Sequence, residues 1–138
     1  MKPPPKTNLT RFIGGLLVIL VLYSAYQLRL GDNLQAASVP RKWRHFFRFA
    51  VVIAVYGAGT WGLGKLPQKW LLGIWHLIHT ILIGTLLLIG LWDWGIAPVS
   101  YAVRRLGNSI HEFLISPLLY LATALVGRLS DHASDVGK

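Results

Sequence analysis

A run of apolar residues over 71–91 contains no charged side chain, and this feature restricts the fold more than any other in the sequence. Trp70 precedes the run, and Trp92 and Trp94 follow it. A helix rises 1.5 Å per residue, so the stretch from Trp70 to Trp92 would be about 33 Å long as a helix. This length matches the hydrocarbon core of a bilayer with an aromatic belt at each surface. The run therefore predicts a membrane-spanning helix over about 70–92.

The composition of the whole chain agrees with a membrane environment. Hydrophobic residues make up 54% of the 138 residues and charged residues only 14%, whereas soluble domains average about 25% charged residues. A soluble protein of 15.4 kDa could not bury so much apolar surface. The chain has no cysteine, which excludes disulfides and thiolate metal sites. We expect an all-α, multi-pass integral membrane protein, located in the plasma (inner) membrane if the source is bacterial.

Three further segments are apolar enough to accompany this helix. The short turn at 65–69 makes the second and third segments an antiparallel hairpin, and Pro117 should kink the fourth segment. Residues 95–109 either enter the bilayer or lie on it. The sequence predicts about four transmembrane helices in two antiparallel hairpins without an extramembrane domain, and the spans cover about 12–28, 46–64, 70–92 and 110–127 within one transmembrane domain, 12–129.

The two ends of the chain and the start of the fourth segment are polar. Residues 1–11 are rich in proline, so we expect an extended tail there, and 130–138 form a polar C-terminal tail. Asn108 or Ser109 could cap the fourth helix. Glu112 would then lie near its N-terminus, where a negative charge is favourable.

The net charge of +9 comes from basic residues that flank the apolar segments. Such residues contact lipid headgroups and set orientation. No nucleic-acid-binding motif accompanies them, so we expect no nucleic-acid partner. Seven Lys or Arg residues fall on each side of a four-span topology, but the dense charge in linker 29–48 favours that side as cytoplasmic, with both termini outside. The lipid-headgroup cluster in this linker consists of Arg41, Lys42, Arg44 and Arg48.

Small residues recur every four positions in the second span. They are Ala50, Ala54, Ala58 and Gly62. This spacing places small side chains along one ridge of a helix, where another helix can approach closely. The ridge predicts a helix-packing surface, either within the chain or with a partner, and it does not indicate catalysis.

His76 and His79 lie within the predicted hydrocarbon region, where ionisable groups are rare and often functional. Their spacing of three residues puts both on one face of a helix. Three interpretations remain open. The neutral imidazoles could bond to a neighbouring helix, one could be an axial ligand of haem b, or both could belong to a proton or ion path.

Other polar residues restrict these interpretations. One haem needs a second histidine from another helix, and His45 and His111 lie near the membrane surfaces. Asp93 is about 21 Å from His79 along a straight helix, too far to complete a zinc site, so no metal is predicted. Asp93 should instead pair with Arg104 or Arg105, or face water.

The sequence contains no nucleophile motif and no phosphate-binding glycine loop. Together with the packing ridge, this predicts a small non-enzymatic membrane protein that acts through helix packing. It would be an accessory or structural subunit of a larger membrane assembly, with a partner membrane protein or a second copy as its neighbour. No cofactor is predicted. The alternative is a haem-binding or proton- or ion-conducting membrane protein that uses His76 and His79.

Overall fold

The structure is a computed structural model that describes residues 6–30 and 39–137. All regular elements in this described part are helices. In chain order they are α1 (Lys6–Ala25), the π-helical segment η1 (Tyr26–Leu30), α3 (Arg41–Leu63), α4 (Lys69–Gly95), α5 (Tyr101–Ile115) and α6 (Pro117–Val136). The predicted all-α class is confirmed.

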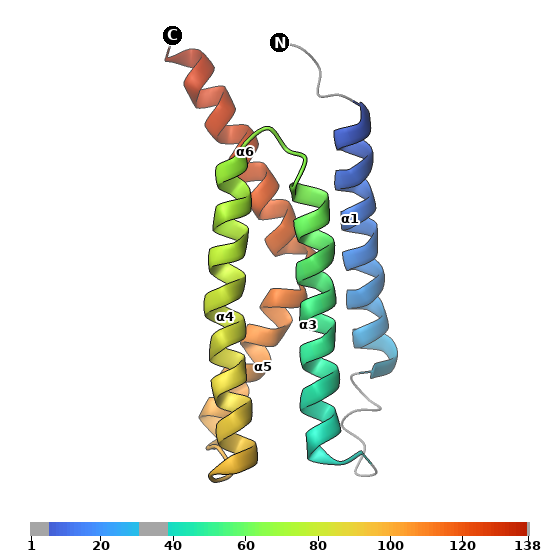
Figure 1. The fold of residues 1–138 in the computed structure, drawn as a ribbon, viewed down its shortest axis with the longest axis vertical. Coiled ribbons are helices and arrows are strands. Elements are labelled where there is room, and N and C mark those ends of the chain that lie inside the picture. The colour runs from blue at the N-terminus through green and yellow to red at the C-terminus, as the bar shows by residue number, and fades with distance from the viewer. Residues whose placement is uncertain (1–5, 31–38, 138) are drawn as a thin grey trace.

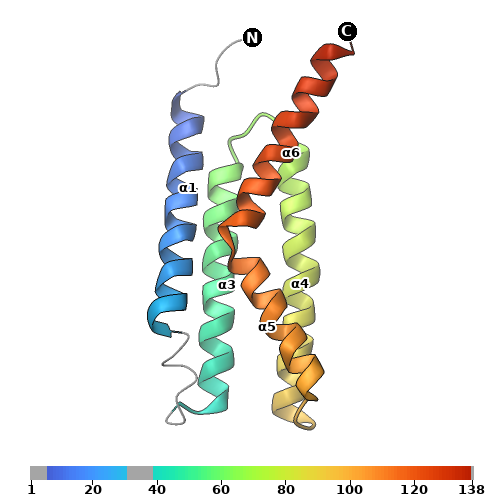
Figure 2. The same cartoon turned by 180° about the vertical axis from the view of Figure 1, so that it is seen from behind.

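Three long helices, α1, α3 and α4, run side by side, and α5 and α6 cross α3 and α4 on one face of the molecule (Figure 1; Figure 2). The start of α1, the turn between α3 and α4 and the end of α6 lie at one end of the molecule (Figure 1). The connection between α4 and α5 lies at the other end. This arrangement follows from the short turn over 64–68, which forces α4 to run back along α3.

Three stretches are each long and apolar enough to cross a membrane: Asn8–Leu28, Lys42–Leu63 and Lys69–Gly95. Helices α5 and α6 pass the same test only together, as a pair bent by 56°. Three or four helices therefore have the length and composition of membrane spans, which is compatible with a multi-pass membrane protein.

The fourth segment differs from its prediction. The expected helix over 110–127 is two helices that meet at Ser116, and α5 already begins at Tyr101. Proline disfavours a helical backbone in the residue before it, and Ser116 has an extended backbone (ψ 132°). The Ser116 hydroxyl also accepts a hydrogen bond from the Leu118 N–H and so caps α6. The expected kink is therefore a 56° bend between two helices, and Pro117 occupies the first position of the second.

The predicted cap of this segment is also wrong. The Ser100 hydroxyl caps α5 by accepting from the Val103 N–H, so Asn108 and Ser109 lie inside the helix. Glu112 lies near the C-terminal end of α5, and the expected interaction with a helix N-terminus does not occur there. The prediction failed because it relied on an uncharged run, whereas α5 is amphipathic, with Val103, Leu106 and Ile110 at helical spacing around two arginines.

Three helix ends extend beyond the sequence prediction. Helix α1 begins at Lys6, so 6–11 are helical rather than extended, while 1–5 lie outside the described residues. The prolines precede this helix, and 6–11 contain none. Helix α3 begins at Arg41, and α6 continues into the polar tail as far as Val136. Polar residues other than proline can form a helix, but a search for apolar patterns does not detect such polar helix ends.

The core collects buried side chains from all of the helices, and two glycines allow a close approach where α1, α3 and α6 meet. A Cβ atom on Gly15 of α1 would lie 3.1 Å from the Gly62 Cα of α3 and 2.8 Å from the Tyr120 hydroxyl of α6. Tyr120 is fully buried, and its hydroxyl donates to the Phe12 carbonyl of α1 over 3.0 Å. This hydrogen bond satisfies a buried polar group and ties α6 to α1.

Candidate functional site

The small-residue ridge of α3 is divided between the interior and the outer surface. Gly62 is buried and Ala58 half-buried, and both lie against Gly15 of α1. Ala50 and Ala54 are exposed. Four residues turn a helix by about 40° more than one full turn, so a row with this spacing winds around the helix. The ridge therefore starts on the outer face and ends beneath α1.

The outer part of the ridge belongs to an exposed apolar face of α3. We define the open α3 face as Trp43, Phe46, Phe47, Ala50, Ile53, Ala54 and Gly57, all of which are exposed. Its aromatic end is clustered, with ring centroids of Trp43, Phe46 and Phe47 between 5.9 and 6.2 Å apart. Beyond the aromatic end, Ile53 is the bulky side chain of the face, and the other members, Ala50, Ala54 and Gly57, are small. A Cβ atom added to Gly57 would have no atom within 4 Å.

The two candidate histidines of α4 both contact Tyr56 of α3. The Tyr56 hydroxyl lies 2.5 Å from His76 Nδ1, and the Tyr56 ring centroid lies 5.2 Å from that of His79. The sequence reasoning overlooked Tyr56, although a tyrosine in an apolar span requires a polar partner for its hydroxyl. The contact shows that His76 and Tyr56 join α4 to α3.

His79 is fully buried beside Trp75. Its Nδ1 donates to the Trp75 carbonyl over 2.9 Å, an i to i−4 contact along α4. Its Nε2 is buried and has no hydrogen-bond partner within the described residues. With the proton on Nδ1, Nε2 carries a lone pair that can accept a proton or bind a metal.

The other interior histidines lie in a second group, away from the first pair. His45 Nε2 lies 3.1 Å from Asp93 Oδ2, and His111 Nε2 lies 3.2 Å from the Arg48 carbonyl oxygen. A haem ligated by His79 would need its second histidine from another helix, and the structure gives both candidates other partners. Across the ranges 6–30 and 39–137, no group of three or more His, Asp or Glu residues could hold a metal ion.

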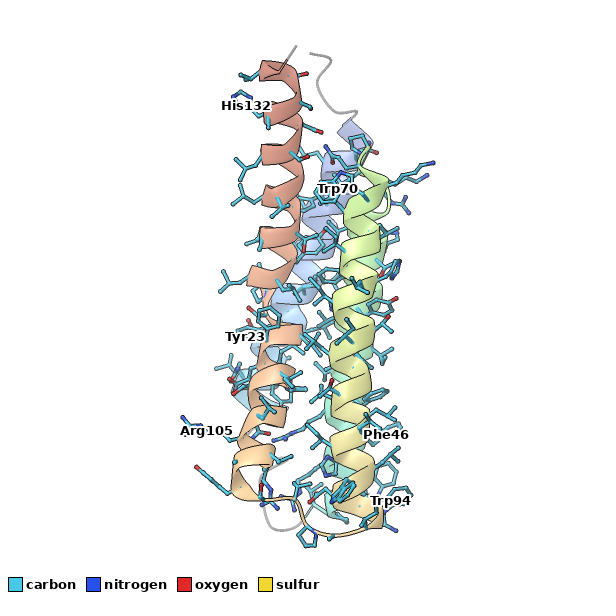
Figure 3. The ribbon with its side chains drawn as sticks, turned by 90° about the vertical axis from the view of Figure 1, so that its left-hand side faces the viewer. Tyr23, Phe46, Trp70, Trp94, Arg105 and His132 are labelled. Atoms are coloured by element: carbon cyan, nitrogen blue, oxygen red, sulfur yellow. The ribbon has the colours of Figure 1, made fainter. Side chains whose placement is uncertain are left out.

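A cavity of about 660 Å³ lies between the first half of α3, the last turns of α4 and α5. We call it the basic pocket. Its polar wall consists of Lys42, Arg44, His45, Arg48, Asp93, Arg104, Asn108 and His111. Its apolar wall includes Phe46, Phe49, Leu86, Leu87, Leu91 and Trp94. Phe46, Trp94 and Arg105 mark this end of the molecule, while Trp70 lies near the opposite end of α4 (Figure 3).

Asp93 is the acidic group of the basic pocket and is 7% exposed. Besides His45, it accepts a hydrogen bond from the Val99 N–H over 3.2 Å, and its Oδ1 lies 4.0 Å from Arg104 Nη2. The pairing with Arg104 agrees with the sequence expectation. The contact with His45 was not predicted, because the expected span began after that residue.

Two arginines of α3 line the pocket with part of their hydrogen-bonding capacity unused. Arg48 Nη1 donates to Asn108 Oδ1 of α5 over 2.7 Å. The Nε atoms of Arg44 and Arg48 are buried and lack a hydrogen-bond partner in the described part of the chain. Lys42 Nζ lies 5.4 Å from the Trp94 ring centroid, a cation–π distance. The structure thus gathers three members of the predicted headgroup cluster at one cavity, and the Arg41 side chain lies outside the described part.

The fold defines an all-helical protein with three or four helices that have the length and composition of membrane spans. No family model, no curated protein and no solved structure matches this chain. Its function is therefore argued from its own residues.

Proposed function

We propose that the chain is a small non-enzymatic integral membrane protein that serves as an accessory or structural subunit of a larger membrane assembly. It would act through helix–helix packing with a partner membrane protein or a second copy of itself. In this proposal α1, α3 and α4 cross the membrane singly, and the bent pair of α5 and α6 makes the fourth crossing.

The observation that carries the proposal is the open α3 face. Its centre, with Ala50, Ala54 and Gly57, lies on a side of α3 that the described helices leave exposed. Lipid tails are as apolar as leucine, so helices in a bilayer associate mainly where small residues allow their backbones to approach. An exposed surface of small residues next to an aromatic cluster allows a close approach of this kind.

The same helix already uses small residues for packing inside the chain. Ala58 and Gly62 approach Gly15 of α1 so closely that a Cβ atom on Gly15 would lie 3.2 Å from the Ala58 carbonyl oxygen. The exposed part of the ridge, Ala50 and Ala54, has the same residue type and spacing. This internal example supports a second helix contact on the outer part of the ridge.

Single-cysteine cross-linking tests the proposal, because the chain has no cysteine of its own. A photoreactive group is attached to Ala54→Cys in native membranes, and Ala122→Cys, an exposed alanine of α6, is the matched control. We expect an adduct with one partner or a second copy from position 54 and little adduct from 122. Equal adducts from both positions, or none from either, would contradict a specific partner at α3.

The second candidate is a haem-binding or proton- or ion-conducting membrane protein that uses His76 and His79. The Nε2 of His79, buried beside Tyr56 and without a hydrogen-bond partner among residues 6–30 and 39–137, favours it. Such a nitrogen can accept a proton or bind iron. An absorbance spectrum and proton flux in liposomes separate this candidate from the first. The second candidate requires either a Soret band or a proton flux, and either signal must be lost in His79→Phe. A colourless protein that conducts no protons would exclude this candidate.

A further inference from the structure

The basic pocket combines positive charge with a ligand-sized volume. Lys42, Arg44 and Arg48 of α3 and Arg104 of α5 line it, whereas Asp93 is the acidic residue of its wall. The volume of about 660 Å³ is within the range of small-molecule sites, about 300–1,000 Å³. Asp93 is already engaged by the Val99 N–H and by His45. The pocket therefore has an excess of cationic groups that an anion would balance.

Unused donors in the wall indicate what kind of anion would fit. The Nε atoms of Arg44 and Arg48 are buried without a partner among the described residues, and a buried unsatisfied donor is unfavourable. Arginine donates in a fixed fork that matches the oxygens of a phosphate group. A phosphate diester presents several acceptors at once, so one ligand could bond to both guanidinium groups once their side chains turn toward the cavity.

The rest of the wall is apolar and reaches the outer surface. Phe46 is 61% exposed, Leu87 43% and Leu91 50%, and all three also line the pocket. A ligand with its charge in the pocket would thus place an apolar part along α3 and α4. Trp94 lies at this end of the molecule (Figure 3), as expected for a tryptophan at the level of lipid headgroups.

We propose that the basic pocket binds the phosphate of an anionic glycerophospholipid, whose acyl chains lie against Phe46, Leu87 and Leu91. Basic pockets between membrane helices are suited to anionic headgroups. The proposal goes beyond the accessory role and does not require a partner protein. Lipid binding is measured on the purified chain alone, so its failure is distinguishable from a failure of the proposed helix packing.

The test is a lipid titration of the purified full chain in one detergent. Phosphatidylglycerol and phosphatidylcholine with the same acyl chains are compared, and bound lipid is counted by native mass spectrometry. The first variant combines Arg44→Gln with Arg48→Gln. The second is Lys42→Gln alone, which keeps the test possible if the double variant fails to fold, because the Lys42 side chain is exposed and tolerates a change. The matched control is Arg105→Gln, which removes one exposed cation from α5 outside the pocket wall.

We expect the wild-type chain to prefer phosphatidylglycerol. Each pocket cation removed should weaken that binding about fivefold, as for a basic residue near an anionic headgroup, while Arg105→Gln should leave it unchanged. Equal binding of both lipids, or an equal loss in Arg105→Gln, would overturn the site. A parallel titration uses inorganic phosphate. If millimolar phosphate displaced the bound lipid, the site would be assigned to free phosphate and the proposal of a lipid ligand would be overturned.

Discussion

At the scale of the residue, the buried and half-buried polar groups of this chain restrict its structure most, because a polar group needs a partner inside an apolar bundle. Tyr56 and His76 satisfy each other between α3 and α4, and Asp93 is held by groups from α3, α4–α5 and α5. These contacts fix which faces of the helices meet, whereas apolar contacts alone are less specific. Changes to them should be measurable as losses of stability.

The contact between Tyr56 and His76 gives the first prediction. Tyr56→Phe removes the hydroxyl and leaves His76 Nδ1 without its partner, so the free energy of unfolding should fall by about 1 kcal/mol. The measurement is reversible unfolding in mixed micelles, followed by circular dichroism. Tyr23→Phe in α1 is the control, since the half-buried Tyr23 side chain makes no hydrogen bond within the described residues. Equal effects of the two substitutions would show that the contact adds nothing.

The carboxylate of Asp93 gives the second prediction. Asp93→Asn removes the negative charge beside His45 and Arg104, so we expect a loss of about 2 kcal/mol in the free energy of unfolding. The same unfolding assay measures it. Glu112→Gln neutralises an exposed acid on α5 and should change stability by less than about 0.5 kcal/mol. A stable Asp93→Asn protein would mean that the polar wall of the pocket does not hold α3, α4 and α5 together.

At the scale of the element, Gly57 and Gly62, two of the three glycines of α3, have opposite surroundings. Gly62 lies under Tyr120 and Gly15, where an added Cβ atom would collide with the Tyr120 hydroxyl oxygen. Gly57 faces outward with no atom within 4 Å of such a Cβ. The close approach of α1, α3 and α6 therefore depends on the glycine at position 62 and not on the glycine at position 57.

Alanine at each position gives the third prediction, in which the two substitutions differ in sign. Gly62→Ala should destabilise the chain by about 1–3 kcal/mol through overpacking. Gly57→Ala should be neutral or stabilising by up to about 1 kcal/mol, because alanine has the higher helix propensity. Unfolding of the two purified variants, side by side, measures the difference. Loss of stability in both would contradict the assignment of Gly57 to an open surface.

The sequence predicted the long uncharged helices better than the helices that contain charged residues. The run over 71–91 with flanking tryptophans indicated a helix that the structure has as α4, Lys69–Gly95. Helix α5 is amphipathic and has two arginines in its first half, so a prediction based on uncharged runs placed its start nine residues late. The basic pocket was missed for the same reason, since Arg104 and Asn108 belong to α5. The meeting of Tyr56 with His76 depends on helix rotation, which periodicity does not fix in all-round apolar helices.

At the scale of the whole molecule, the start of α1 and the end of α6 lie at the same end (Figure 1), so both ends face one side if the bundle crosses a membrane. The charge density of 29–48 favours the opposite side as cytoplasmic. An impermeant maleimide applied to intact cells should therefore label Ser134→Cys near the end of α6. It should not label Ala97→Cys beyond α4 until the cells are opened. The reverse pattern would invert the orientation.

The central claim is that the open α3 face holds a partner helix, and the mass of the particle extracted with its own lipids tests it most directly. The chain is isolated in native nanodiscs from its own membrane, and its complex is weighed by mass spectrometry. Wild-type protein should appear in one defined assembly heavier than 15.4 kDa. The variant Ala50→Leu with Ala54→Leu should release the single chain, while Ala122→Leu should not. A single chain of 15.4 kDa in the wild type would contradict the claim.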